Sequence, residues 1–114
     1  MQLDTMAKEG VTILRPMGER LDADNADILK AKIKELFEDG SKTLLVDLAA
    51  VRFIDSSGLG ALVSGFKSAM SHKGQLVLCG LQEQVRSMFD LTRLNRVFDI
   101  YASEEEARAA VSAK

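Results

Sequence analysis

The stretch Phe53-Ile54-Asp55-Ser56-Ser57-Gly58-Leu59-Gly60 decides how this chain folds, because a strand must give way to a helix within it. The apolar run before it, residues 44–48, predicts a buried strand. After it, apolar side chains recur at helical spacing from about residue 57 to residue 73, and Asp and Ser are favoured where a helix begins. The predicted core stripe of this helix is Leu59, Leu62, Val63, Phe66 and Met70.

Outward from this unit, strand and helix patterns alternate along the chain. Leu3–Lys8 and residues 11–15 are separated by Glu9-Gly10, which predicts a tight turn between two strands. Strands that alternate with helices favour a mainly parallel sheet. We therefore expect an α/β fold with a mixed, mostly parallel sheet of four to five strands, an N-terminal β-hairpin and about four helices. The other predicted elements are a helix beginning after Asp24 or Asn25, a strand over Gln75–Cys79, a helix over 83–89, a strand over 97–101 and a helix over 103–112 that opens with the capping box Ser103-x-x-Glu106.

Bulk composition narrows the class of protein. At 114 residues the chain is expected to form a single domain, residues 1–114. A net charge of −2 and an aromatic content of 5% argue against a nucleic-acid partner. The single Cys79 fits a reducing compartment, residues 1–10 lack a signal-peptide pattern, and no run of about 18 apolar residues occurs. We expect a cytoplasmic protein without direct membrane insertion.

Three enzyme motifs come close in this region and fail. Gly58-Leu59-Gly60 lacks the third glycine of a dinucleotide-binding loop, and Phe66 interrupts the Gly-Lys-Ser of a phosphate-binding loop. No Gly-x-Ser-x-Gly elbow surrounds Ser56. The only histidine, His72, lies about four turns further along the predicted helix, roughly 20 Å away, and cannot act as its base. The sequence predicts no catalytic residue, no cofactor and no metal site.

Two interpretations of the serines remain open. Ser56 and Ser57 can simply cap the helix, or the helix start can carry a phosphate, which backbone N–H groups and the helix dipole favour. Gly58 and Gly60 each cost roughly 0.5–1 kcal/mol against Ala, which capping alone does not require but the close approach of another backbone or a phosphate does. Leu59 is either an exposed apolar anchor or a core residue.

The hexapeptide Asp55-Ser56-Ser57-Gly58-Leu59-Gly60 after a hydrophobic strand resembles the signature of the anti-sigma-factor antagonists, bacterial proteins built on the STAS domain. The resemblance covers essentially the whole chain and predicts a STAS-like fold. It also takes in Gly18, Leu21-Asp22-Ala23, Val85, Phe89 and Leu94. Between Gly18 and the Leu21-Asp22 pair, this chain carries one residue more than the family pattern.

The resemblance implies a partner switch that controls transcription. In that family an anti-sigma factor that is itself a serine kinase phosphorylates the first serine of the pair, here Ser56, and a PP2C-type phosphatase removes the phosphate. The unmodified antagonist binds the kinase and frees a sigma factor, whereas the phosphorylated form lets go. The residues implied to contact the partner are Asp22, Asp55, Ser57, Gly58, Leu59 and Gly60. An alternative output is a STAS subunit of a membrane-associated transport complex, or a switch for a target other than a sigma factor.

Overall fold

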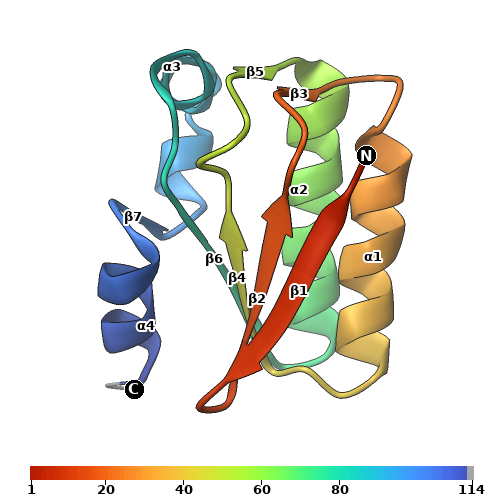
Figure 1. The fold of residues 1–114 in the computed structure, drawn as a ribbon, viewed down its shortest axis with the longest axis vertical. Coiled ribbons are helices and arrows are strands. Elements are labelled where there is room, and N and C mark those ends of the chain that lie inside the picture. Colours follow the sequence, from red (N-terminus) through yellow and green to blue (C-terminus); the bar gives the residue numbers. More distant parts are fainter. Residues whose placement is uncertain (113–114) are drawn as a thin grey trace.

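The computed structural model describes residues 1–112, and its centre is a five-stranded sheet (Figure 1). The strand order is β1-β2-β4-β6-β7, in which only the β1–β2 pair is antiparallel. The hairpin turns through Glu9 (φ 52°) and Gly10 (φ 82°), the positive values that a two-residue hairpin loop needs. The predicted α/β fold with its N-terminal hairpin is confirmed. The strand bounds are β1 Leu3–Lys8, β2 Val11–Pro16, β4 Thr43–Asp47, β6 Gln75–Cys79 and β7 Ile100–Tyr101.

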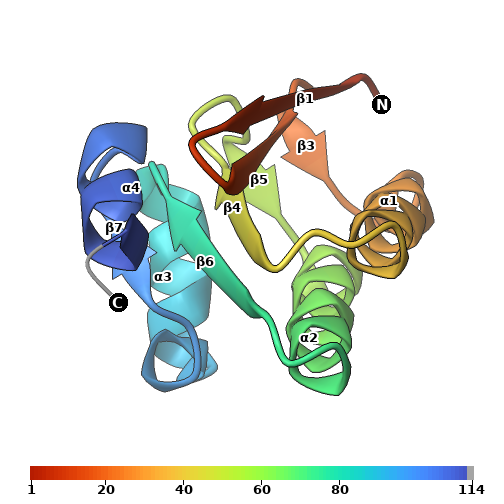
Figure 2. The ribbon, with the colours of Figure 1, turned by 90° about the horizontal axis from the view of Figure 1, so that it is seen from below.

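Both faces of the sheet are covered, and the alternation of side chains along each strand divides the core in two. In β4, Leu44 and Val46 join the larger cluster, while Leu45 joins the smaller one on the opposite face. Figure 2 shows α1 and α2 side by side on one side of the sheet and α4 on the other. The helices are α1 Ala26–Glu38, α2 Ser56–Ser71, α3 Glu83–Leu91 and α4 Glu104–Ser112.

The buried face of α2 differs from the predicted stripe. Met70 is 65% exposed, so its assignment to the core was wrong. The helix instead buries Leu62, Gly65 and Ala69, and a Cβ on Gly65 would lie 3.0 Å from Ile33 of α1. The buried face is therefore centred on Gly65 and Ala69, and Met70 lies outside it in the last turn of the helix.

A second, two-stranded sheet was not predicted. It pairs β3 (Arg20–Leu21) with β5 (Phe53–Ile54) in parallel, and Figure 1 shows both beside the start of α2. Strands of two residues are too short to produce a period-two pattern. The last predicted strand is also shorter than expected, because Leu94–Arg96 forms a 3₁₀ turn and only β7 pairs with β6. At α4 the expected cap forms, since Ser103 Oγ accepts a hydrogen bond from the Glu106 N–H at 3.2 Å.

Candidate functional site

The helix α2 begins at Ser56, at the exit of β5, where the sequence placed it. Asp55 is the N-cap residue, and its Oδ1 accepts a hydrogen bond from the Gly58 N–H at 3.0 Å. Ser56 and Ser57 are both exposed in the first turn. Because Asp55 supplies the side-chain cap, the Ser56 hydroxyl is not needed for capping and is accessible to another protein.

The pairing of β3 with β5 brings Asp22 to the same end of the domain as Ser56. The Asp55 N–H donates to the Leu21 carbonyl at 3.3 Å, so the loop after β3 lies directly beside the start of α2. A hollow of about 260 Å³ separates the two loops. Its lining is Arg20, Asp22, Ala23, Asp24, Phe53 and Asp55. Three carboxylates against one guanidinium make this surface acidic.

The Asp22 loop is held by hydrogen bonds that the sequence did not reveal. Asn25 was expected as a possible N-cap of α1, and it occupies that position, but its side chain makes no capping bond. Its Oδ1 instead accepts from the Asp22 N–H at 3.0 Å, and its Nδ2 donates to the Arg20 carbonyl at 2.7 Å. Arg20 donates to Asp22 at 3.3 Å and stacks over the Phe53 ring at 4.2 Å. The acidic surface is therefore ordered before any partner arrives.

The two glycines of the first turn have different roles. A Cβ on Gly58 would lie 2.5 Å from the Leu21 carbonyl oxygen and 2.7 Å from Ile54 Cγ1, so the approach of β3 requires glycine there. A Cβ on Gly60 would meet nothing within 4 Å. The fold therefore explains Gly58 and leaves Gly60 free for an approach from outside.

The structure resolves the two interpretations of Leu59. Its side chain is only 5% exposed and belongs to the larger core cluster. Leu59 is therefore a core residue and not an exposed anchor, because its direction on α2 points it at the sheet while Ser56 and Gly60 face solvent.

A second hollow lies where α2 meets α1. It has a volume of about 380 Å³, and Ser57 and Gly60 face α1 across it. Lys30 and Asp27 are the charged groups in its wall. The motif residues thus divide between two surfaces: Asp55 faces the Asp22 loop, whereas Ser57 and Gly60 face α1. The full lining is Ala23, Ala26, Asp27, Lys30, Ser57, Gly60 and Ala61.

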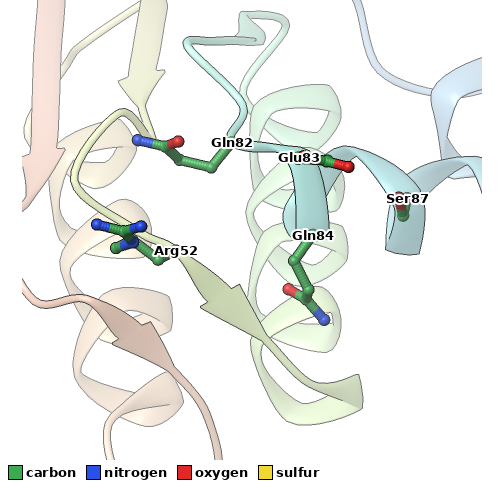
Figure 3. A pocket seen from close by; sticks show the side chains of 5 residues that line it. All are labelled: Arg52, Gln82, Glu83, Gln84 and Ser87. Carbon is green, nitrogen blue, oxygen red and sulfur yellow. The ribbon is translucent and has the colours of Figure 1, made fainter.

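Helix α3 supports the site from behind through Gln84, a residue that sequence reasoning missed. Its Oε1 accepts from the Ile54 N–H at 2.9 Å, and its Nε2 donates to the Ile54 carbonyl at 3.3 Å. The side-chain amide thus pairs with β5 on the edge that β3 leaves open. Gln84 also lines a hollow of about 400 Å³. Figure 3 shows it with the other lining residues, which are Arg52, Gln82, Glu83 and Ser87.

The groups that catalysis or metal binding would need lie elsewhere. His72 follows the last residue of α2, at the opposite end of the helix from Ser56, where its Nδ1 lies 2.8 Å from the Ser68 carbonyl. Cys79 is fully buried in β6, and burial raises the pKa of its thiol to about 12. Within residues 1–112, no three His, Cys, Asp or Glu side chains gather in a group that could hold a metal ion.

No helix in the described part of the chain is long and apolar enough to cross a bilayer.

Comparisons with known proteins agree with this fold. The STAS domain profile matches residues 2–107. An anti-sigma-B factor antagonist from Bacillus subtilis is 36% identical over 85 residues, which cover 75% of this chain and 77% of that protein. The crystal structure of a candidate anti-sigma factor antagonist from Thermotoga maritima matches with a TM-score of 0.90 at 31% identity, covering 96% of this chain and 94% of that one.

The structure of the Bacillus cell fate determinant SpoIIAA in its phosphorylated form is also similar. Its TM-score is 0.72 at 26% identity, with coverage of 96% of this chain and 97% of that one. The family profile spans nearly the whole chain, and the resemblance carried by Asp55–Gly60 is thereby confirmed. This protein belongs to the STAS domain family.

Proposed function

We propose that this protein is an anti-sigma-factor antagonist that binds a kinase-type anti-sigma factor while Ser56 is unmodified and releases it when Ser56 is phosphorylated. One observation carries the proposal: Ser56 is exposed at the first position of α2 although Asp55 already provides the cap. The relatives that match over three quarters of this chain bear the antagonist name, and SpoIIAA has a phosphorylated form.

The scaffold can accept a phosphate at this position without rearrangement. Phosphate adds about −1.5 to −2 charges and three strong acceptor oxygens. At the start of α2 it meets backbone N–H groups and the positive end of the helix dipole. Modification therefore changes the charge of the surface and leaves the fold intact.

The partner interface responds in the opposite way, because the surface beside Ser56 is already acidic. Asp22 and Asp55 lie on the two walls of the hollow next to it, and Arg20 is already paired with Asp22. A docked kinase must match these carboxylates with positive or neutral groups, and an added dianion disturbs that match. Like-charge contacts in an interface cost several kcal/mol, and about 4 kcal/mol is a thousandfold in affinity.

The domain acts in this scheme by binding and not by catalysis. The kinase supplies ATP chemistry, and a PP2C-type phosphatase restores the hydroxyl. Both enzymes need access to the Ser56 side chain, which its exposure provides. Such a cycle operates in the cytoplasm, where we expect the protein to be located.

The proposal is tested by the affinity of single variants for the anti-sigma factor encoded in the same genome. Ser56→Ala is expected to bind like the unmodified protein and to resist phosphorylation by ATP, while Ser56→Asp is expected to bind at least about tenfold more weakly. Ser71→Asp is the matched control, because it adds the same charge at the exposed far end of the same helix. Equal affinity of the Ala and Asp variants at position 56 would refute the switch.

A further inference from the structure

Helix α4 covers the face of the sheet that α1, α2 and α3 leave open. Only Ala107 and Val111 of this helix are buried, whereas α1 buries four residues. Apolar burial alone therefore stabilises the docking of α4 less than it stabilises the docking of α1. The smaller core that it closes consists of Val11, Ile13, Leu45, Val77, Cys79, Ala107 and Val111.

A polar anchor joins the first turn of α4 to the sheet. Arg15 of β2 donates to both carboxylate oxygens of Glu104, from Nε at 2.5 Å and from Nη2 at 2.7 Å. Two parallel hydrogen bonds of this kind are the strongest form of an Arg–carboxylate pair. They connect residues that are 89 positions apart in the chain. No other ion pair is found between α4 and the sheet among the described residues.

A second carboxyl group lies beside this anchor and opposes it. Asp47 ends β4, and its Oδ1 accepts a hydrogen bond from the Ala49 N–H at 2.9 Å. Burial, and next the neighbouring Glu104 carboxyl group, raise the pKa of Asp47 to about 6. The bonds from Arg15 hold the pKa of Glu104 down at about 2. Glu104 is therefore ionised at every relevant pH, and Asp47 decides the charge of the pair.

We call the charged groups around the Arg15–Glu104 pair the cluster. Each strand of the five-stranded sheet, and α4 itself, contributes a charged or titratable group to it. Arg15 and Arg108 are the cations that lower the pKa of Glu104, and the Arg108 Nε is buried with no hydrogen-bond partner in residues 1–112. The negative charge of Asp4, on β1, raises the pKa of Arg15. The groups that face the cluster are Asp4, Arg15, Asp47, Cys79, Tyr101, Glu104 and Arg108.

We propose that α4 is a latch, a helix that undocks reversibly from the second face of the sheet. The Arg15–Glu104 pair holds it in the docked position, and its docking weakens when Asp47 and Glu104 are both ionised. In the docked state, burial and the neighbouring Glu104 carboxylate favour a protonated Asp47. Undocking separates the two carboxyl groups, so the undocked state holds that proton less firmly. Opening therefore increases as the pH rises from about 4 through 6, and it is constant above that range.

Cys79 is a built-in reporter of this opening. It is the only cysteine of the chain, it is fully buried, and it belongs to the core that α4 closes.

The rate at which 4,4′-dithiodipyridine labels Cys79 is measured from pH 4.5 to pH 8 in the unmodified protein and in Asp47→Asn. The ratio of the two rates cancels the intrinsic pH dependence of the thiol. We expect this ratio to be near one at pH 4.5 and to rise about tenfold by pH 7, less than a two-unit pKa shift allows, because Asp47 keeps contact with solvent. A ratio that does not change with pH overturns the proposal.

Two further measurements separate latch opening from general unfolding. In hydrogen exchange corrected for intrinsic amide rates, the amides of residues 107–111 are expected to exchange well before those of residues 44–46. The opening of residues 107–111 should increase with pH over the same range as the labelling ratio. Simultaneous exchange of both segments overturns the proposal, because the thiol is then reached only by global unfolding. Glu104→Gln is expected to speed labelling at pH 5. The ratio of its labelling rate to that of Asp47→Asn should rise less between pH 4.5 and pH 7 than the ratio for the unmodified protein, because burial alone then raises the pKa of Asp47. Glu35→Gln, which removes the exposed Lys32–Glu35 pair of 3.4 Å, is the matched control and should leave labelling unchanged. An equal effect of the two Gln variants also overturns it.

Discussion

Replacing each glycine of the α2 first turn by alanine gives a matched pair of perturbations with opposite expected signs. At Gly58 the new methyl group would lie 2.5 Å from the Leu21 carbonyl oxygen, a backbone atom that cannot rotate away. Overpacking of this kind costs about 1–3 kcal/mol, and the higher helix propensity of alanine returns up to about 1 kcal/mol. We expect Gly58→Ala to lower the free energy of unfolding by about 1–2 kcal/mol.

At Gly60 the same substitution meets open space, so only the propensity term remains. Gly60→Ala is expected to raise the free energy of unfolding by about 0.5–1 kcal/mol. Urea denaturation followed by circular dichroism measures both variants, and equal slopes against urea confirm that only stability has changed. If Gly60 is kept for the approach of a partner, the more stable Gly60→Ala protein also binds the anti-sigma factor more weakly.

The sign of the two changes is the decisive result. If both variants were destabilised equally, glycine would be needed at both positions for backbone reasons and the contrast drawn from the Leu21 contact would be wrong. If Gly58→Ala were neutral, β3 would have to yield at no cost, which contradicts the pairing that places Asp22 beside α2.

Three other changes test the supports of the site and the charge of the sheet. Gln84→Ala removes both side-chain bonds to Ile54 and should cost about 1–3 kcal/mol in thermal unfolding and speed amide exchange at Ile54; unchanged exchange would mean that α3 does not support β5. Asp55→Ala removes the cap on the Gly58 N–H and should lower the free energy of unfolding in urea by about 1 kcal/mol. An unchanged value would mean that a serine hydroxyl replaces the cap. Because burial raises the pKa of Asp47 from 3.8 to about 6, ionisation of this group weakens the fold as pH rises through 6. Asp47→Asn should match the unmodified protein near pH 4 and exceed it by about 1 kcal/mol at pH 8, and an equal difference at both pH values would exclude this carboxyl as the cause.

Local patterns in the sequence were sufficient for the elements whose cause is local. The apolar run of residues 44–48 predicted the buried strand, and Asp55 with its two serines marked the helix start that α2 has. Hydrophobic period and capping chemistry depend on residues within a turn or two of one another, which is why they can be read without coordinates.

Contacts between distant parts of the chain decided the rest. The need for glycine at position 58 comes from the carbonyl of Leu21, and the support of β5 comes from Gln84, 30 residues away. Leu59 and Met70 are both apolar and lie on nearly the same side of α2, yet Leu59 in the first turn is buried and Met70 in the last turn is exposed. The sequence by itself determined that a serine hydroxyl would stand at the start of a helix, where we propose that it accepts a phosphate. Only the tertiary structure decided which acidic groups surround it, because strand pairing and helix packing join residues whose proximity leaves no periodic trace in the chain.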